Sequence, residues 1–149
     1  HFSLPAGARR AVGVELEAPR HAIAAKALAD LRGLLSGGDG AGAGAGDAGS
    51  PQDAEEATLR VDGRELTYVR GDMLKVALGD ASVVFANSLA FPKGLAHQLQ
   101  LHFLEVLPPG TVVILGHKPG GCHRGLAFVG SAEMEASWSV TYNMHIYIV

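Results

Sequence analysis

The chain has 149 residues, of which 48% are hydrophobic and 18% charged, and its formal net charge is −3. This length suits one domain, and the composition predicts a packed core rather than disorder. The weak negative charge provides no general basic surface, so we expect any DNA contact to lie outside this segment. No apolar run approaches the roughly 18–20 residues that span a bilayer, and the single cysteine, Cys122, excludes an internal disulfide framework.

A strand and a helix are predicted near the start of the chain. Ala11–Glu15 is a short apolar run that ends on a carboxylate, which favours a buried strand. Pro19 suits a first helical turn, and Arg20–Leu35 continues with strong helix formers. One stripe of this helix, expected to pack on a sheet, contains Ile23, Ala27, Leu31 and Leu34. The Gly/Ala-rich segment 36–51 that follows predicts a flexible surface insertion rather than a phosphate-binding loop.

The middle of the chain predicts three strands. Leu59–Asp72 contains two short strand-like pieces separated by Asp62-Gly63, a dipeptide typical of tight hairpin turns. Ser82–Asn87 predicts a buried parallel strand that presents a polar side chain at its carboxyl end.

The last third predicts a helix and three further strands. Lys93–Leu107 has an apolar helical face, and Thr111–Leu115 is another buried strand. Leu126–Trp138 and Val140–Val149 predict two long antiparallel neighbours, the last of them buried mainly on one face. Together these elements predict an α/β fold with a mainly parallel sheet that ends in an antiparallel hairpin.

Three polar residues stand at the carboxyl ends of successive predicted strands: Glu15, Asp72 and Asn87. In a doubly wound sheet such ends converge on one crevice. A carboxylate there can accept both hydroxyls of a ribose. An aspartate after the next strand can accept a hydrogen bond from an adenine amino group, while the adjoining Met73 packs on the adenine ring. Taken singly, each of the three is more often a turn or cap residue.

Metal and nucleophile chemistry are not predicted. Five residues of types that can bind zinc lack the spacing of a zinc site: His97, His102, His117, Cys122 and His123. No serine lies in a G-x-S-x-G elbow, and Cys122 has His123 only as a sequence neighbour.

Several blocks of the sequence resemble consecutive blocks of one family. They are GVELE at Gly13–Glu17, RGDML at Arg70–Leu74, VVFANSLAF at Val83–Phe91, a helix starting GLAHQLQLHF at Gly94, PPGTVVILGHKP ending at Pro119, EASW at Glu135–Trp138 and VTYNMHIY at Val140–Tyr147. The family is that of the non-SET histone H3 lysine methyltransferases, the disruptor-of-telomeric-silencing type. The FANSLAF block followed by the HQL helix is the specific part, since acidic strand ends alone would fit any class I methyltransferase.

The resemblance implies a class I S-adenosylmethionine-dependent methyltransferase with a Rossmann-like sheet. It would act in the nucleus, as a chromatin regulator, on a lysine of nucleosomal histone H3, with neither a metal nor a membrane as partner. Glu15 matches the family's ribose-binding acid, and Asp72 and Met73 match its adenine-binding pair. Phe91 matches a second residue that lines the cofactor pocket.

The same resemblance implies a catalytic site and a substrate channel. Asn87 matches the asparagine beside the transferred methyl group. Trp138 and Tyr142 match aromatic residues that wall the lysine channel, and Tyr142 is assigned to catalysis together with Asn87. From the residues alone, Trp138 and Tyr142 are equally well explained by ordinary packing of a terminal hairpin.

The chain also departs from the family. The matching blocks start after the family's first strand and its Gly-rich cofactor motif, so we expect a partial catalytic domain whose sheet is incomplete at the N-terminus. We expect this chain alone to bind S-adenosylmethionine poorly and to be inactive. Two other readings stay open: a class I methyltransferase for another protein or a small molecule, and a catalytically silent fold remnant that acts as a binding module.

Overall fold

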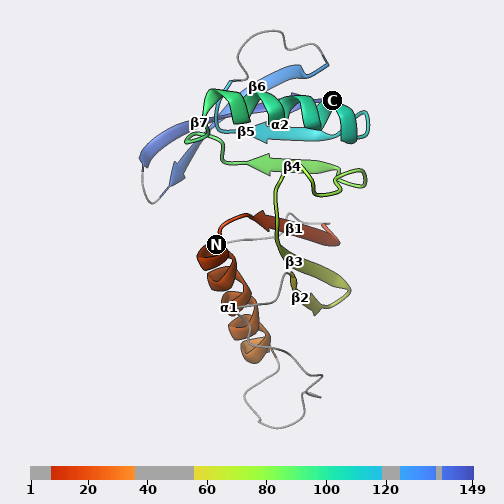
Figure 1. Ribbon diagram of the computed structural model, residues 1–149, viewed down its shortest axis with the longest axis vertical. Coiled ribbons are helices and arrows are strands. Elements are labelled where there is room, and N and C mark those ends of the chain that lie inside the picture. The colour runs from red at the N-terminus through yellow and green to blue at the C-terminus, as the bar shows by residue number, and fades with distance from the viewer. Residues whose placement is uncertain (1–7, 36–55, 119–124, 137–138) are drawn as a thin grey trace. The chain divides into compact units, whose positions relative to one another are not determined.

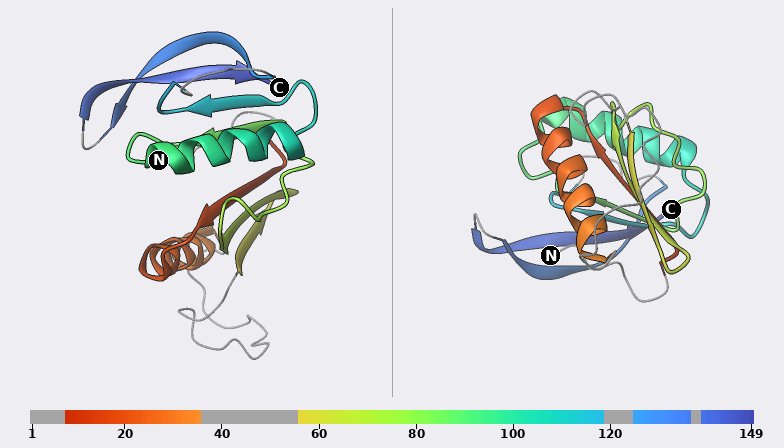
Figure 2. Two further views of the ribbon diagram at one scale, coloured as in Figure 1. Left: turned by 45° about the horizontal axis from the view of Figure 1, so that its top comes forward. Right: turned by 90° about the horizontal axis from the view of Figure 1, so that it is seen from below.

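The computed structural model describes residues 8–35, 56–118, 125–136 and 139–149. The Gly/Ala-rich segment 36–51 and Trp138 lie outside these residues. The protein is an α/β protein with mixed sheets, and it divides into two compact units, His1–Val76 and Ala77–Val149. In the described residues each unit combines one helix with one sheet (Figures 1 and 2).

The first unit consists of β1 (Arg10–Glu15), α1 (Ala18–Leu35), β2 (Glu56–Val61) and β3 (Arg64–Arg70). Its strands lie in the order β1-β3-β2, with β1 parallel to β3 and β2 antiparallel to β3. The predicted hairpin turn is confirmed, because Asp62 and Gly63 have φ angles of 49° and 72°. Positive φ at both central residues is what a type I′ turn requires.

Helix α1 buries a different face from the one predicted. Its buried side chains are His21, Ala25 and Leu28, which follow a helical spacing. Ile23 is 71% exposed and Leu34 80% exposed, so the predicted stripe is wrong. Apolar residues lie on every side of this helix, and hydrophobicity therefore does not distinguish its faces. The small Ala25 and the His21 ring, whose Nε2 lies 3.4 Å from the Tyr68 carbonyl oxygen, meet the sheet instead.

The second unit consists of β4 (Val83–Ala86), α2 (Lys93–Val106), β5 (Val112–Leu115), β6 (Ala127–Ala136) and β7 (Ser139–Ile148). The strand order is β4-β5-β7-β6; β4 is parallel to β5, and β7 is antiparallel to both of its neighbours. The predicted terminal hairpin is confirmed. The prediction of a mainly parallel sheet is wrong. In the second sheet β7 lies between β5 and β6 and is antiparallel to both. In the first sheet β2 is antiparallel to β3, because a two-residue turn can join only antiparallel strands.

The core of the second unit lies where α2 runs along the β4–β5 side of the sheet (Figures 1 and 2). Leu99 and Phe103 of α2 are each 2% exposed, which confirms the predicted apolar face of this helix. Val113 and Tyr147 are direct partners across β5 and β7, so they share one face, and both are buried. Met144 is also buried but lies on the opposite face, because it is three residues from Tyr147. The expectation that β7 is buried mainly on one face is therefore wrong: β7 is an interior strand.

Strand β4 is a parallel strand, as predicted, but it is not a buried one. Val83 is 54% exposed and Phe85 51% exposed. The reason is its position: β4 is an edge strand and pairs only with β5 in the described residues. Strand β1 is likewise an edge strand of its own sheet in the described residues, and the prediction that it is buried is wrong, because none of its residues is buried.

Candidate functional site

The two predicted cofactor carboxylates lie at the same end of the first sheet. Glu15 is the last residue of β1, and its register partner Arg70 is the last residue of the parallel strand β3. The Gly71 amide donates a hydrogen bond of 3.0 Å to the Glu15 carbonyl, and Asp72 follows directly. The parallel pairing thus brings Glu15 and Asp72 to the carboxyl ends of neighbouring strands.

Local hydrogen bonds orient both carboxylates. Glu15 Oε1 accepts from the Glu17 amide at 3.0 Å, and Asp72 Oδ1 accepts from the Leu74 amide at 3.0 Å. Asp72 Oδ2 also lies 3.5 Å from Lys75 Nζ. Such contacts are those of ordinary turn residues. A carboxylate has about four lone-pair sites, however, so these bonds leave acceptor capacity for a ligand.

Met73 and the catalytic candidates are found on loops and on the terminal hairpin. Met73 is half-buried in the turn that follows Asp72. Asn87 follows directly after β4 and is exposed, and Phe91 is half-buried just before α2. The half-buried Tyr142 lies on β7 opposite Met134.

The second unit also brings its predicted residues to one end of the sheet. Ala86, Leu115 and His145 are consecutive partners across β4, β5 and β7. Because β7 runs antiparallel, its residues before His145 extend beyond the carboxyl end of β5. Asn87 and Tyr142 therefore both lie toward the carboxyl end of the β4–β5 pair.

Backbone hydrogen bonds define the bend that presents Asn87. The Ala86 carbonyl accepts from the Ser88 amide at 2.9 Å and from the Gly116 amide at 3.2 Å. The Phe91 amide donates to the Ser88 carbonyl at 3.1 Å. Asn87 thus stands at the tip of a tight bend, with its side chain accessible to a ligand.

A Ser88–His117 pair was missed by the sequence reasoning. Ser88 is 1% exposed, and its Oγ lies 2.5 Å from Nδ1 of His117. Burial lowers the pKa of His117, and this outweighs the opposing effect of hydrogen bonding to Ser88. A signal was present in the sequence: Ser88 and His117 each follow the carboxyl end of one of two consecutive predicted strands, the same criterion that selected Asn87.

His117 belongs to a wider group on the same sheet. His145 Nδ1 lies 2.8 Å from Ser131 Oγ on the neighbouring strand. Burial lowers the pKa of His145, and the charges of Lys118 and His117 lower it further. Lys118 Nζ lies 5.9 Å from the centre of the Phe128 ring. This end of the second sheet is therefore rich in ionisable groups.

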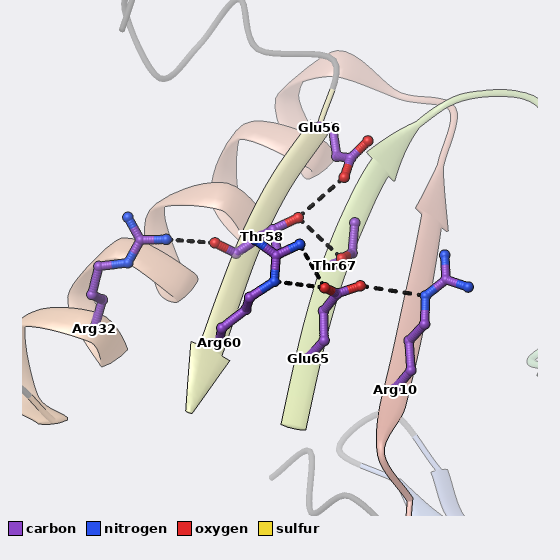
Figure 3. A network of polar contacts seen from close by, with 7 residues as sticks. All are labelled: Arg10, Arg32, Glu56, Thr58, Arg60, Glu65 and Thr67. Atoms are coloured by element: carbon purple, nitrogen blue, oxygen red, sulfur yellow. Dashed lines mark hydrogen bonds and ion pairs between the residues drawn. The ribbon is translucent and has the colours of Figure 1, made fainter. Parts of the chain in front are cut away.

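A second polar network lies at the other end of the first sheet. Figure 3 shows Glu65 between two guanidinium groups, with its carboxylate oxygens 3.4 Å from Arg10 Nε and 2.7 Å from Arg60 Nη2. Beside it, the hydroxyls of Thr58 and Thr67 lie 3.0 Å apart. These contacts join β1, β2 and β3: those of Glu65 lie at the amino ends of β1 and β3, and the threonine pair lies in mid-strand. They stabilise the sheet and do not include any predicted site residue.

The predicted site residues thus fall into two sets. Glu15, Asp72 and Met73 belong to the first unit, and Asn87, Phe91 and Tyr142 to the second. Glu15 and Asp72 lie at one end of the first sheet, and Asn87 and Tyr142 lie toward one end of the second. A single crevice formed by both sets stays a prediction.

Comparison with known proteins does not identify a family for this chain. Neither the protein-family models nor the curated protein sequences that were searched match this chain. No helix in the described ranges is long and apolar enough to cross a membrane. In the same ranges no group of three or more His, Cys, Asp or Glu residues could hold a metal ion.

Proposed function

We propose that this chain is part of the catalytic domain of a class I, S-adenosylmethionine-dependent methyltransferase that acts in the nucleus on a lysine of nucleosomal histone H3. One observation carries the proposal: the VVFANSLAF block, in which Asn87 comes directly after the parallel strand β4 and just before α2. The block that resembles the histone methyltransferase family thus includes a strand end suited to ligand binding.

The sheets support this reading in two further ways. A parallel β4–β5 pair continues into an antiparallel terminal hairpin, the order expected for the proposed fold. In that fold the first strand lies between the strand that ends at Glu15 and the strand that ends at Asn87. In the described residues, strands β1 and β4 are each an edge strand of their own sheet, so each has an edge at which such a strand could pair.

The proposed cofactor contacts follow from the donors and acceptors available. When bound, S-adenosylmethionine supplies a methyl group on a positively charged sulfur. The free acceptor capacity of Glu15 suits the ribose hydroxyls, and that of Asp72 suits the adenine amino group. Met73 and Phe91 would provide apolar contact for the cofactor.

Methyl transfer to an amine is an in-line displacement, and it needs positioning more than proton transfer. The amine must be neutral to attack, and an apolar channel favours the neutral form because desolvation lowers the pKa of a lysine. Tyr142 and Trp138 would wall such a channel. The Asn87 carboxamide can hydrogen-bond near the reacting atoms without donating or removing a proton in the reaction.

The test is a methyl-transfer assay with the full-length protein that contains this chain. Reconstituted nucleosomes, free histone H3 and a panel of small-molecule acceptors would be offered with radiolabelled S-adenosylmethionine. The proposal predicts label on histone H3 within nucleosomes. Label on another acceptor would favour a class I methyltransferase of different specificity, and no label on any acceptor would favour a silent binding module. Either result would overturn the proposal.

A further inference from the structure

A buried side-chain hydrogen bond joins the two loops that leave the carboxyl ends of β4 and β5. Ser88 belongs to the loop after β4 and His117 to the loop after β5, and Oγ and Nδ1 lie 2.5 Å apart. Ser88 is 1% exposed, so its hydroxyl has little access to water as an alternative partner. A buried hydroxyl that loses its partner is costly, and the pair is therefore expected to persist.

The backbone around this pair is tightly packed. A Cβ atom on Gly116 would lie 3.2 Å from the amide nitrogens of Ser88 and Leu89 and 2.9 Å from Leu89 Cγ. The Ala86 carbonyl accepts from the Ser88 and Gly116 amides together. The two loops are thus in close backbone contact, and a Cβ atom at position 116 would require Leu89 and the neighbouring backbone to shift.

Asn87 lies between two residues that these contacts fix. On one side, Ala86 is held by the shared carbonyl; on the other, Ser88 is held by its amide, its carbonyl and its hydroxyl. Of these anchors, the hydroxyl bond to His117 is the one made by a side chain, so it can be removed without altering the backbone.

We propose that His117 is a positioning residue: through Ser88 it fixes the bend on which Asn87 is presented. This inference rests on the function proposed above for Asn87. His117 touches neither of the proposed reactants in this assignment, and its contribution is to reduce the number of conformations open to the Asn87 backbone.

The first test measures the bend itself and does not depend on activity. Hydrogen–deuterium exchange of residues 87–91 would be compared in the wild-type protein and in Ser88→Ala, His117→Ala and His117→Asn. An asparagine amide can replace Nδ1 as a hydrogen-bond partner. Loss of one hydrogen bond predicts exchange roughly 2- to 12-fold faster in the two alanine variants, with wild-type exchange in His117→Asn.

The matched control is His97→Ala, which removes an exposed histidine from α2. It should leave exchange of residues 87–91 unchanged. Wild-type exchange in His117→Ala would overturn the proposal. If His117→Ala fails to fold, the other two variants still test the proposal. Unchanged exchange in Ser88→Ala, or accelerated exchange in His117→Asn, would overturn the proposal.

The second test uses methyl transfer and separates kcat from cofactor affinity. A positioning role predicts that His117→Ala lowers kcat while the Kd for S-adenosylmethionine stays within about twofold of wild type, and that His117→Asn restores kcat. Adding Ser88→Ala to His117→Ala should cause little further loss, because both changes remove the same bond.

A general loss of structure would instead raise Kd and lower kcat together, without rescue, and would overturn the positioning role. If the wild-type protein transfers no methyl group at all, the proposed function fails. The exchange experiment then still decides whether His117 fixes the bend.

Discussion

The Glu15 carboxylate allows a direct test of the proposed cofactor contacts. Replacing Glu15 with alanine removes the acceptor proposed for the ribose hydroxyls. It also removes the hydrogen bond to the Glu17 amide, 3.0 Å long and exposed to solvent. Glu15→Gln separates the two effects, because a carboxamide oxygen can still accept from the Glu17 amide but carries no negative charge.

The expected magnitude follows from the bonds that are lost. Each charge-assisted hydrogen bond from a ribose hydroxyl to a carboxylate contributes about 1.5–3 kcal/mol. Loss of even one such bond predicts binding at least about tenfold weaker. The bond to Glu17 is exposed, so its loss should lower the free energy of unfolding by only about 0.5–1.5 kcal/mol. Glu15→Gln should keep most of that stability and still lose much of the affinity.

The assay is calorimetric titration of S-adenosylmethionine into the full-length protein, with urea unfolding measured on the same variants. Glu17→Gln is the matched control, because its exposed side chain has no assigned cofactor contact. The reasoning would be refuted if Glu15→Ala bound the cofactor within about twofold of wild type while remaining folded.

Three further predictions concern packing, the channel and pH. Gly13→Ala should lower the free energy of unfolding by about 1–3 kcal/mol in urea titrations, because the new Cβ would lie 2.5 Å from the Tyr68 ring. Gly33→Ala, with open space around it, should not destabilise; equal effects would contradict this. Tyr142→Ala should lower kcat in nucleosome assays by admitting water to the proposed lysine channel. An unchanged kcat would contradict the assignment of Tyr142 to the channel wall. The lowered pKa of His117 predicts stability that is present above about pH 6.5 and falls on acidification, and His117→Asn should weaken this pH dependence of the urea midpoint.

Local signals predicted local structure well. Asp62-Gly63 specified a tight turn, because few residues other than glycine, asparagine and aspartate adopt positive φ readily. The apolar spacing from Leu99 to Phe103 identified the buried face of α2, since polar residues occupy much of the rest of that helix. The alternating pattern after Val140 identified the last strand.

The errors arose where burial depends on distant partners. Ile23 and Ala25 are both apolar, and only the sheet decides which of them is covered. The apolar sequence of β4 does not reveal that it is an edge strand, because pairing is a property of the whole sheet. Ser88 and His117 are 29 residues apart, so no local pattern could pair them.

Methyl transfer by Asn87→Ala tests the central claim most directly. Radiolabel on histone H3 in reconstituted nucleosomes would be measured for the full-length wild-type protein and for this variant, together with the Kd for S-adenosylmethionine. The account predicts labelled histone H3 with the wild type, and in the variant a kcat lower by roughly 10- to 100-fold with cofactor affinity nearly unchanged. Equal rates for the two proteins, or no transfer by the wild type, would contradict it.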